Sequence, residues 1–237
     1  MIQEYEVKEI ITDLEKLGEW SEVIDPKKEG KLCQQIIGEL KATMRAKDLE
    51  YLTAPQIGYN RRIFCVRFNN NDYRTFINAS ISNMAKLTIA RETCNSISDK
   101  RFIIPRYNMI EVIYYTPLGA VEARKIMGRS AWVIHHCVDH LDGSLTCDIG
   151  LEIDDMFDNA TDEEREEVIK MYMESLDIRE KQLREEIEND EELKKMDNAI
   201  KFMDSVRRGE TTLDSVKVDK NEDANSKSVE RIEDAQW

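Results

Sequence analysis

The stretch His135-His136-Cys137-Val138-Asp139-His140-Leu141 contains all three histidines of this 237-residue chain. Histidine is the commonest metal ligand and titrates near neutral pH. The surrounding segment, 130–141, is mostly apolar, follows Gly128 and ends at Asp142-Gly143, which predicts a buried helix. His136 and His140 are four residues apart, so they lie on one helical face and can bind a single ion.

A third ligand is needed, because catalytic metal sites usually hold the ion with three protein groups. The best candidate is Cys94, in Arg91-Glu92-Thr93-Cys94-Asn95-Ser96, which would give one sulfur and two nitrogen ligands. Metallohydrolases with the pattern H-E-x-x-H carry a glutamate base after the first histidine. This chain has Cys137 there, which could be a small buried residue, an additional or replacement ligand, or a redox or catalytic thiol.

The rest of the amino-terminal part predicts helices and strands in separate runs. Residues 26–46 predict a helix, because Leu32, Ile36, Leu40 and Met44 form an apolar stripe. Strands are predicted at 63–68, 74–77, 109–115 and 120–126, and the last two are expected to form a hairpin. The order of helix, strands and helix favours an α+β fold over an alternating parallel sheet.

The charge of the chain divides it near Gly150. The whole sequence has 48 acidic and 34 basic residues, whereas residues 1–150 have 20 of each, so residues 151–237 have 28 acids and 14 bases. We therefore expect a metal-binding domain at 1–150, an acidic helical extension at 151–208 and a disordered tail at 209–237.

Two helices are expected in the acidic extension. Thr161-Asp162-Glu163-Glu164 is a capping box, which predicts the start of the first helix. A second helix is expected to carry Leu193, Met196, Ile200 and Met203.

Composition also restricts the partners and the compartment. The acidic extension argues against direct nucleic-acid binding, which needs a basic face. No apolar run approaches the roughly 20 residues that a membrane helix needs, and the acidic amino terminus does not resemble a signal peptide. Five scattered cysteines are typical of reduced thiols, so we expect a cytoplasmic protein.

Three separated segments together resemble the peptide deformylase family. Thr53-Ala54-Pro55-Gln56-Ile57-Gly58 is similar to that family's motif G-x-G-x-A-A-P-Q, and Glu92-Thr93-Cys94-Asn95-Ser96 to its motif E-G-C-L-S. His136-Cys137-Val138-Asp139-His140-Leu141-Asp142-Gly143 is similar to H-E-x-D-H-L-x-G. The three segments occur in the family order, and the resemblance covers roughly residues 8–150.

The resemblance implies a fold in which antiparallel or mixed strands wrap a central metal-binding helix. It implies that Cys94, His136 and His140 bind Fe(II) or a substitute such as Zn, Ni or Co. Gln56 and the backbone N–H of Asn95 would stabilise the developing oxyanion of a formyl group. The implied reaction removes the formyl group from the initiator methionine of nascent chains, so the implied partner is an N-formyl-methionyl peptide.

Several departures from the family pattern occur at motif positions that the family uses for catalysis or substrate binding. Cys137 replaces the glutamate that would carry the proton, and Asp139 is a supporting carboxylate in the family rather than the base. Leu49 and Tyr51 replace glycines of the first motif, so we expect a substrate groove that is narrowed or reshaped. In the remaining positions Thr93 replaces Gly, Asn95 replaces Leu, His135 replaces Gln and Ser98 replaces Pro.

Other candidate residues have a structural as well as a functional interpretation. Gln56 is either a substrate-binding amide or an ordinary loop amide, and His135 is expected only to pack or to face solvent. Cys33, Cys65 and Cys147 are expected to be core or surface thiols.

Two hypotheses of function follow. The first is a divergent metal-dependent deformylase, or a related amidohydrolase, whose activity is weak because its proton transfer is weakened or altered. The second is a catalytically inactive, deformylase-like binding protein whose acidic helices contact a protein partner.

Overall fold

The computed structural model describes residues 5–68, 72–191 and 198, and the chain divides into two compact units, 1–167 and 168–237. The expected second helix of the extension (Leu193, Met196, Ile200, Met203) and the expected disordered tail, 209–237, lie outside the described residues. The boundaries expected from charge, at 150 and 208, remain predictions.

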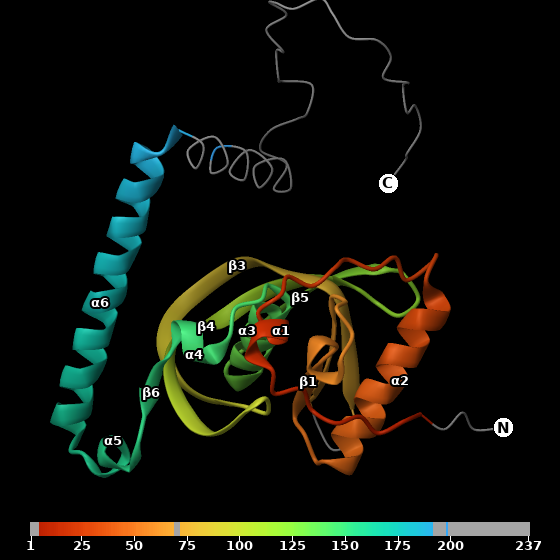
Figure 1. The fold of residues 1–237 in the computed structure, drawn as a ribbon, viewed down its shortest axis with the longest axis horizontal. Helices are drawn as coiled ribbons and strands as arrows, with labels where there is room; N and C mark the ends of the chain where they lie inside the picture. The colour runs from red at the N-terminus through yellow and green to blue at the C-terminus, as the bar shows by residue number, and fades with distance from the viewer. Residues whose placement is uncertain (1–4, 69–71, 192–197, 199–237) are drawn as a thin grey trace, which may run out of the picture. The chain divides into compact units, whose positions relative to one another are not determined.

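One six-stranded sheet organises the first unit (Figure 1). The strands follow the order β1-β2-β3-β4-β5, with β6 paired to β4, and every ladder is antiparallel. Their bounds are β1 Tyr51–Thr53, β2 Ile63–Arg67, β3 Tyr73–Cys94, β4 Ile97–Tyr115, β5 Val121–Met127 and β6 Leu151–Ile153. The α+β class expected from the sequence is confirmed.

Helices precede, separate and follow these strands along the chain. Their bounds are α1 Leu14–Leu17, α2 Gly30–Ala46, the 3-10 helix η1 Pro55–Ile57, α3 Arg129–Leu141, α4 Thr146–Ile149, α5 Asp155–Asn159 and α6 Asp162–Asn189. The described part of the chain contains no helix with the length and apolar character needed to cross a membrane.

Helix α2 has the apolar stripe expected of it. Ile36, Leu40 and Met44 are fully buried and pack in a cluster with β1 and β2. The helix begins at Gly30 rather than at residue 26, so the expected start is wrong. The reason is local, since the Asp25 carboxylate accepts hydrogen bonds from the backbone N–H groups of Lys27 and Lys28 and holds them in a separate turn.

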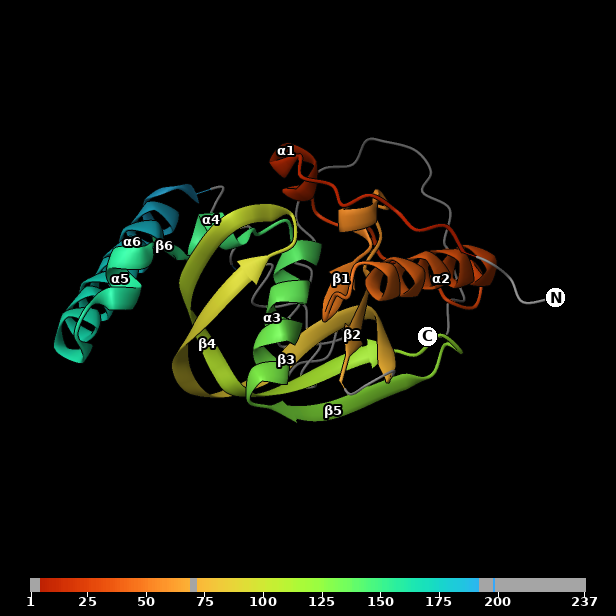
Figure 2. The same ribbon diagram turned by 90° about the horizontal axis from the view of Figure 1, so that it is seen from below.

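Helix α3 lies at the centre of the first unit, with β3 and β4 curving past it (Figure 2). Its residues Ala131, Ile134 and Leu141 are fully buried and pack in one cluster with side chains of β2, β3 and β4. Alternate residues of β4 point into the same cluster, as a half-buried strand requires. Strands therefore surround the helix that carries the histidines.

The long hairpin of β3 and β4 differs from the expectation. The predicted strands at 74–77 and 109–115 are only the outer ends of strands that extend to Cys94 and begin at Ile97. The middle of β3 is exposed and mixes polar residues with apolar ones such as Met84 and Leu87, so it has no buried apolar face to recognise. The pairing of β3 with β4 is interrupted by register shifts near Asn78. This pairing places Cys94, at the end of β3, next to the histidines of α3.

The capping box of the extension forms as predicted. The Thr161 hydroxyl accepts a hydrogen bond from the Glu164 N–H at 3.2 Å, and the Glu164 carboxylate accepts one from the Thr161 N–H at 2.8 Å. Helix α6 begins directly after Thr161.

Candidate metal centre

Three buried side chains converge where the end of β3 meets α3. The possible ligand atoms of Cys94, His136 and His140 all lie within 4.8 Å of one another. The Sγ atom of Cys94 is 3.2 Å from Nε2 of His140, and the two imidazole rings meet at an angle with their centroids 4.9 Å apart. One turn of helix thus places both rings on the face that Cys94 approaches.

Protonation in this cluster favours the ligand form of the cysteine. Burial alone would raise the pKa of the Cys94 thiol, but the adjacent His136 and His140 imidazoles lower it to about 5. Burial lowers the pKa of His136, but the adjacent Cys94 and Glu92 side chains raise it to about 9. Cys94 is therefore a thiolate at neutral pH, the form that binds transition metals.

A buried ionic network orients His136. Arg106 donates two hydrogen bonds to Glu92, at 2.6 and 2.9 Å, and one to Asp139 at 2.6 Å. The Glu92 carboxylate in turn lies 3.0 Å from Nδ1 of His136. A carboxylate at this nitrogen fixes the tautomer and leaves Nε2 free to bind an ion.

The Nε2 atom of His136 is buried and has no hydrogen-bond partner among the described residues. A buried nitrogen without a partner is costly, and a bound cation would satisfy it. The donor set of one thiolate and two imidazoles suits Fe(II), Zn, Ni or Co rather than Mg or Ca. These residues therefore fit a divalent transition-metal ion.

Gln56 lies beside the cluster with its amide orientation fixed. Its Oε1 accepts hydrogen bonds from the backbone N–H and the hydroxyl of Thr53, at 3.0 and 3.1 Å. Its Nε2 donates to the Ser96 hydroxyl at 3.1 Å and lies 4.0 Å from Cys94 Sγ. The fully buried amide thus presents donors toward the possible ion.

Cys137 lies in a different environment from Cys94. It is fully buried in the apolar cluster of α3, and it is not one of the three residues whose ligand atoms converge. Burial raises the pKa of its thiol well above the usual value. A neutral thiol in such surroundings neither ligates an ion nor carries protons at neutral pH.

The other histidine and cysteines lie outside the cluster of ligand atoms. Burial lowers the pKa of His135 to about 4, and its ring stacks on Tyr107 with centroids 6.2 Å apart. Cys33 and Cys65 are buried thiols, and Cys147 is an exposed one.

Two residues contact His136 in ways that the sequence did not predict: Glu92 had no predicted role, and Tyr51 was expected only to narrow or reshape a groove. Glu92 lies two residues before Cys94 on a strand, and side chains two residues apart point to the same face. This spacing is visible in the sequence and could have predicted that Glu92 lies near the metal site. Tyr51 contacts His136 edge-on, with ring centroids 4.8 Å apart, and its hydroxyl donates to the Thr93 carbonyl at 2.7 Å. The Asn95 amide donates to the Tyr51 carbonyl at 3.3 Å, which adds a second bridge between β1 and the Cys94 turn.

An antiparallel sheet wraps a helix from which two histidines face a cysteine, and this arrangement defines an α+β protein with a candidate site for one metal ion. The family described as polypeptide deformylase matches residues 8–154. The chain belongs to the peptide deformylase family.

Peptide deformylases among the relatives and the solved structures support this assignment. The chain is 30% identical over 146 residues to the peptide deformylase of Dictyoglomus turgidum, covering 60% of this chain and 95% of that one. A structure of the Acinetobacter baumannii enzyme has a TM-score of 0.57 at 22% identity, covering 61% of this chain and 99% of that one. The Thermotoga maritima structure has a TM-score of 0.52 at 26% identity, covering 62% and 97%.

Proposed function

We propose that this protein is a metal-dependent hydrolase that removes the formyl group from N-formyl-methionyl peptides, and that it does so slowly. The observation that carries the proposal is the convergence of Cys94, His136 and His140 within 4.8 Å. These residues would hold Fe(II) or Zn, with Ni or Co as substitutes. A divalent ion in such a set acts as a Lewis acid that makes water nucleophilic at neutral pH.

Gln56 and the backbone N–H of Asn95 would stabilise the developing oxyanion. The Gln56 amide donors face the cluster, and the backbone N–H of Asn95 follows the cysteine in the chain. Two such donors stabilise charge that develops on a carbonyl oxygen, and each contributes typically 10²–10³-fold in rate. The fixed orientation of Gln56 supports this role.

Slow turnover follows from Cys137. A positioned general base contributes about 10²–10⁴-fold in rate. The buried, protonated thiol supplies no such base, and the Asp139 carboxylate is held by Arg106. We therefore expect proton transfer to limit the rate.

A second candidate function is binding without turnover. It is favoured by Tyr51, which stands where the family has a glycine, contacts His136 edge-on and donates a hydrogen bond to the Thr93 carbonyl. The acidic extension would then contact a protein partner, and its charge argues against nucleic acid. Either function requires a reduced Cys94, which supports a cytoplasmic location.

Metal analysis and hydrolysis test the proposal. Anaerobically purified protein should contain close to one equivalent of a transition metal; less than about a tenth would contradict the site. Hydrolysis of formyl-Met-Ala-Ser should be detectable and should rise about 10²-fold or more in Cys137→Glu, or in Cys137→Glu combined with Tyr51→Gly. Metal-loaded protein that hydrolyses nothing before or after these changes would favour the second function.

A further inference from the structure

A cavity of about 260 Å³ lies beside the candidate metal centre, and His136 forms part of its wall. Most of its lining comes from β1, β3, β4 and α3. Ile153 of β6 and Asp158 of α5 also line it, although both follow α3 in the chain. The volume is below the roughly 300–1,000 Å³ of typical ligand pockets, so the position of these two residues matters for what the cavity can accept.

The charged side chains of the cavity lining are already paired with one another or with neighbours. Each lining arginine has a carboxylate partner: Arg91 has Asp158, Arg101 has Asp158 and Asp155, and Arg129 has Glu50. Glu92, the other lining carboxylate, is paired with Arg106 and His136. A further charge in the cavity would find no unpaired partner in this lining, and burying an unpaired charge is costly. The cavity therefore suits an uncharged side chain.

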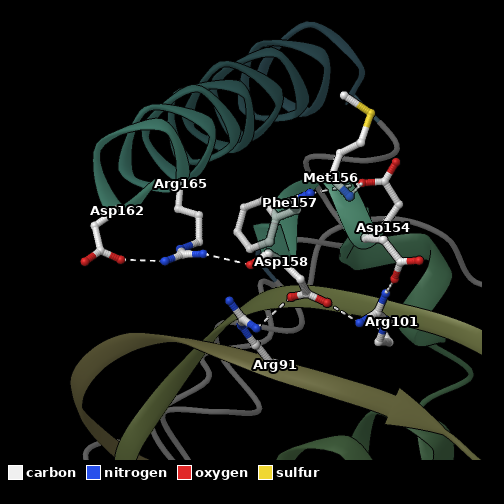
Figure 3. A network of polar contacts seen from close by, with 9 residues as sticks. Arg91, Arg101, Asp154, Met156, Phe157, Asp158, Asp162 and Arg165 are labelled. Atoms are coloured by element: carbon white, nitrogen blue, oxygen red, sulfur yellow. Dashed lines mark hydrogen bonds and ion pairs between the residues drawn. The ribbon is translucent and has the colours of Figure 1, made fainter. Parts of the chain in front are cut away.

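Asp158 holds α5 against both strands of the long hairpin. Figure 3 shows its carboxylate between Arg91 of β3 and Arg101 of β4, bonded to both. The guanidinium of Arg91 also lies over the ring of buried Phe157, 5.4 Å from the ring centroid. The Asp158 carbonyl accepts a hydrogen bond from Arg165 at the start of α6, at 3.1 Å. Asp158 therefore joins α5 to three other elements.

The chain that leads into α5 is fixed as well. Strand β6 pairs with β4, and Ile153 lies opposite Arg101 in that ladder. Asp154 then caps α5, because its carboxylate accepts hydrogen bonds from two backbone N–H groups of the helix, at 2.9 and 3.1 Å. Both lining residues of this segment, Ile153 and Asp158, are thus held in place by neighbouring elements.

We propose that the segment 153–158 limits the length of the substrate side chain that lies beside the ion. Ile153 and Asp158 close the cavity around an uncharged, unbranched chain of about the length of methionine, and a much longer chain would have to displace them. Forcing extra methylene groups into a fixed, packed space is unfavourable. The inference rests on the proposed function, since it identifies the residues that select the size of the substrate side chain.

Binding of tripeptides without a formyl group tests this limit independently of hydrolysis. We would titrate two C-terminally amidated peptides into the Co(II)-loaded full-length protein and measure Kd by calorimetry. One is norleucine-Ala-Ser, whose first side chain has the shape of methionine, and in the other an unbranched eight-carbon side chain replaces that of norleucine. The wild-type protein should bind the norleucine peptide at least about tenfold more tightly, although the longer chain is the more hydrophobic of the two.

Two variants enlarge the cavity by different means. Asp158→Ala removes the carboxylate that both arginines of the hairpin contact, and Ile153→Ala removes an apolar lining side chain without touching an ion pair. Each should bring the two affinities to within about threefold of each other. Asp155→Ala is the matched control, because Asp155 lies on the same helix and pairs with Arg101, but its side chain is 90% exposed and is not part of the lining. It should leave the preference unchanged, and all variants should retain their Co(II).

Equal or tighter binding of the longer peptide by the wild-type protein would overturn the inference, and so would the absence of binding of either peptide. A preference that survives both enlarging variants, or that Asp155→Ala also loses, would overturn it too. If Asp158→Ala does not fold, Ile153→Ala alone decides. The hydrolysis of formyl-Met-Ala-Ser tests the proposed function separately. A protein that hydrolyses nothing but shows the length limit supports this inference alone, and an active one without the limit supports only the proposed function.

Discussion

Replacing Glu92 by Gln isolates the contribution of the buried network behind the metal centre. The Glu92 side chain is 9% exposed, accepts hydrogen bonds from Arg106 at 2.6 and 2.9 Å, and lies 3.0 Å from His136. Glutamine has the same shape without the charge. Arg106 would keep its contact with Asp139, so the arginine stays paired and the change tests the carboxylate itself.

The pKa of Glu92 gives the magnitude. Burial raises this pKa, but hydrogen bonds with Arg106 and His136 dominate and lower it from 4.5 to about 2. A difference of that size corresponds to about 3 kcal/mol of stability. Because the folded pKa is the lower one, this stability is fully present above pH 4.5 and is lost as the pH falls through about 2.

Urea unfolding of chelator-treated protein measures this contribution without the metal. At about pH 7, Glu92→Gln should lower the free energy of unfolding by about 3 kcal/mol, and the difference from wild type should shrink toward about pH 2. Glu152→Gln is the control, because Glu152 pairs with exposed Lys100 and such pairs contribute less than about 1 kcal/mol. A loss no larger than the control's, or one that is constant with pH, would refute the argument.

Three further outcomes are expected. Cys94→Ser should reduce bound metal to less than about a tenth of an equivalent, measured by elemental analysis, because it removes the thiolate ligand. At about pH 7, metal binding should release about one proton, since His136 has a pKa of about 9 and Cys94 one of about 5; calorimetry in two buffers measures the number. Tyr51→Phe should lower the free energy of unfolding by about 1 kcal/mol in urea, with the metal content unchanged, because the hydrogen bond to Thr93 is lost.

Local periodicity explains which elements could be predicted. The stripe of Ile36, Leu40 and Met44 and the apolar run of α3 both repeat with the helical period, and both helices form. The hairpin of β4 and β5 was predictable from the turn at 116–119. The middle of β3 was not, because an exposed strand owes its existence to pairing with β4 rather than to its own pattern.

The residues of the candidate site also divide into those that local sequence spacing predicts and those that it does not. His136 and His140 are neighbours within one helix, so their convergence follows from spacing alone. The approach of Cys94 depends on the long hairpin of β3 and β4, which no local pattern predicted, although Cys94 itself was the expected third ligand. The contact of Tyr51 with His136 crosses from β1 to α3, so no local pattern encodes it.

Two departures from the family pattern, at positions 51 and 137, lie in one apolar cluster. The Tyr51 hydroxyl donates a hydrogen bond to the Thr93 backbone carbonyl, and the Asn95 side-chain amide donates one to the Tyr51 backbone carbonyl. The Tyr51 ring also belongs to the apolar cluster that buries Cys137. A carboxylate at position 137 would enter that cluster beside an aromatic ring, and burying an unpaired charge there is costly. Loss of the glycine at 51 therefore favours a small neutral residue at 137. Restoring the glutamate alone should recover less activity than restoring it together with the glycine, because substitutions within one packed cluster do not act additively.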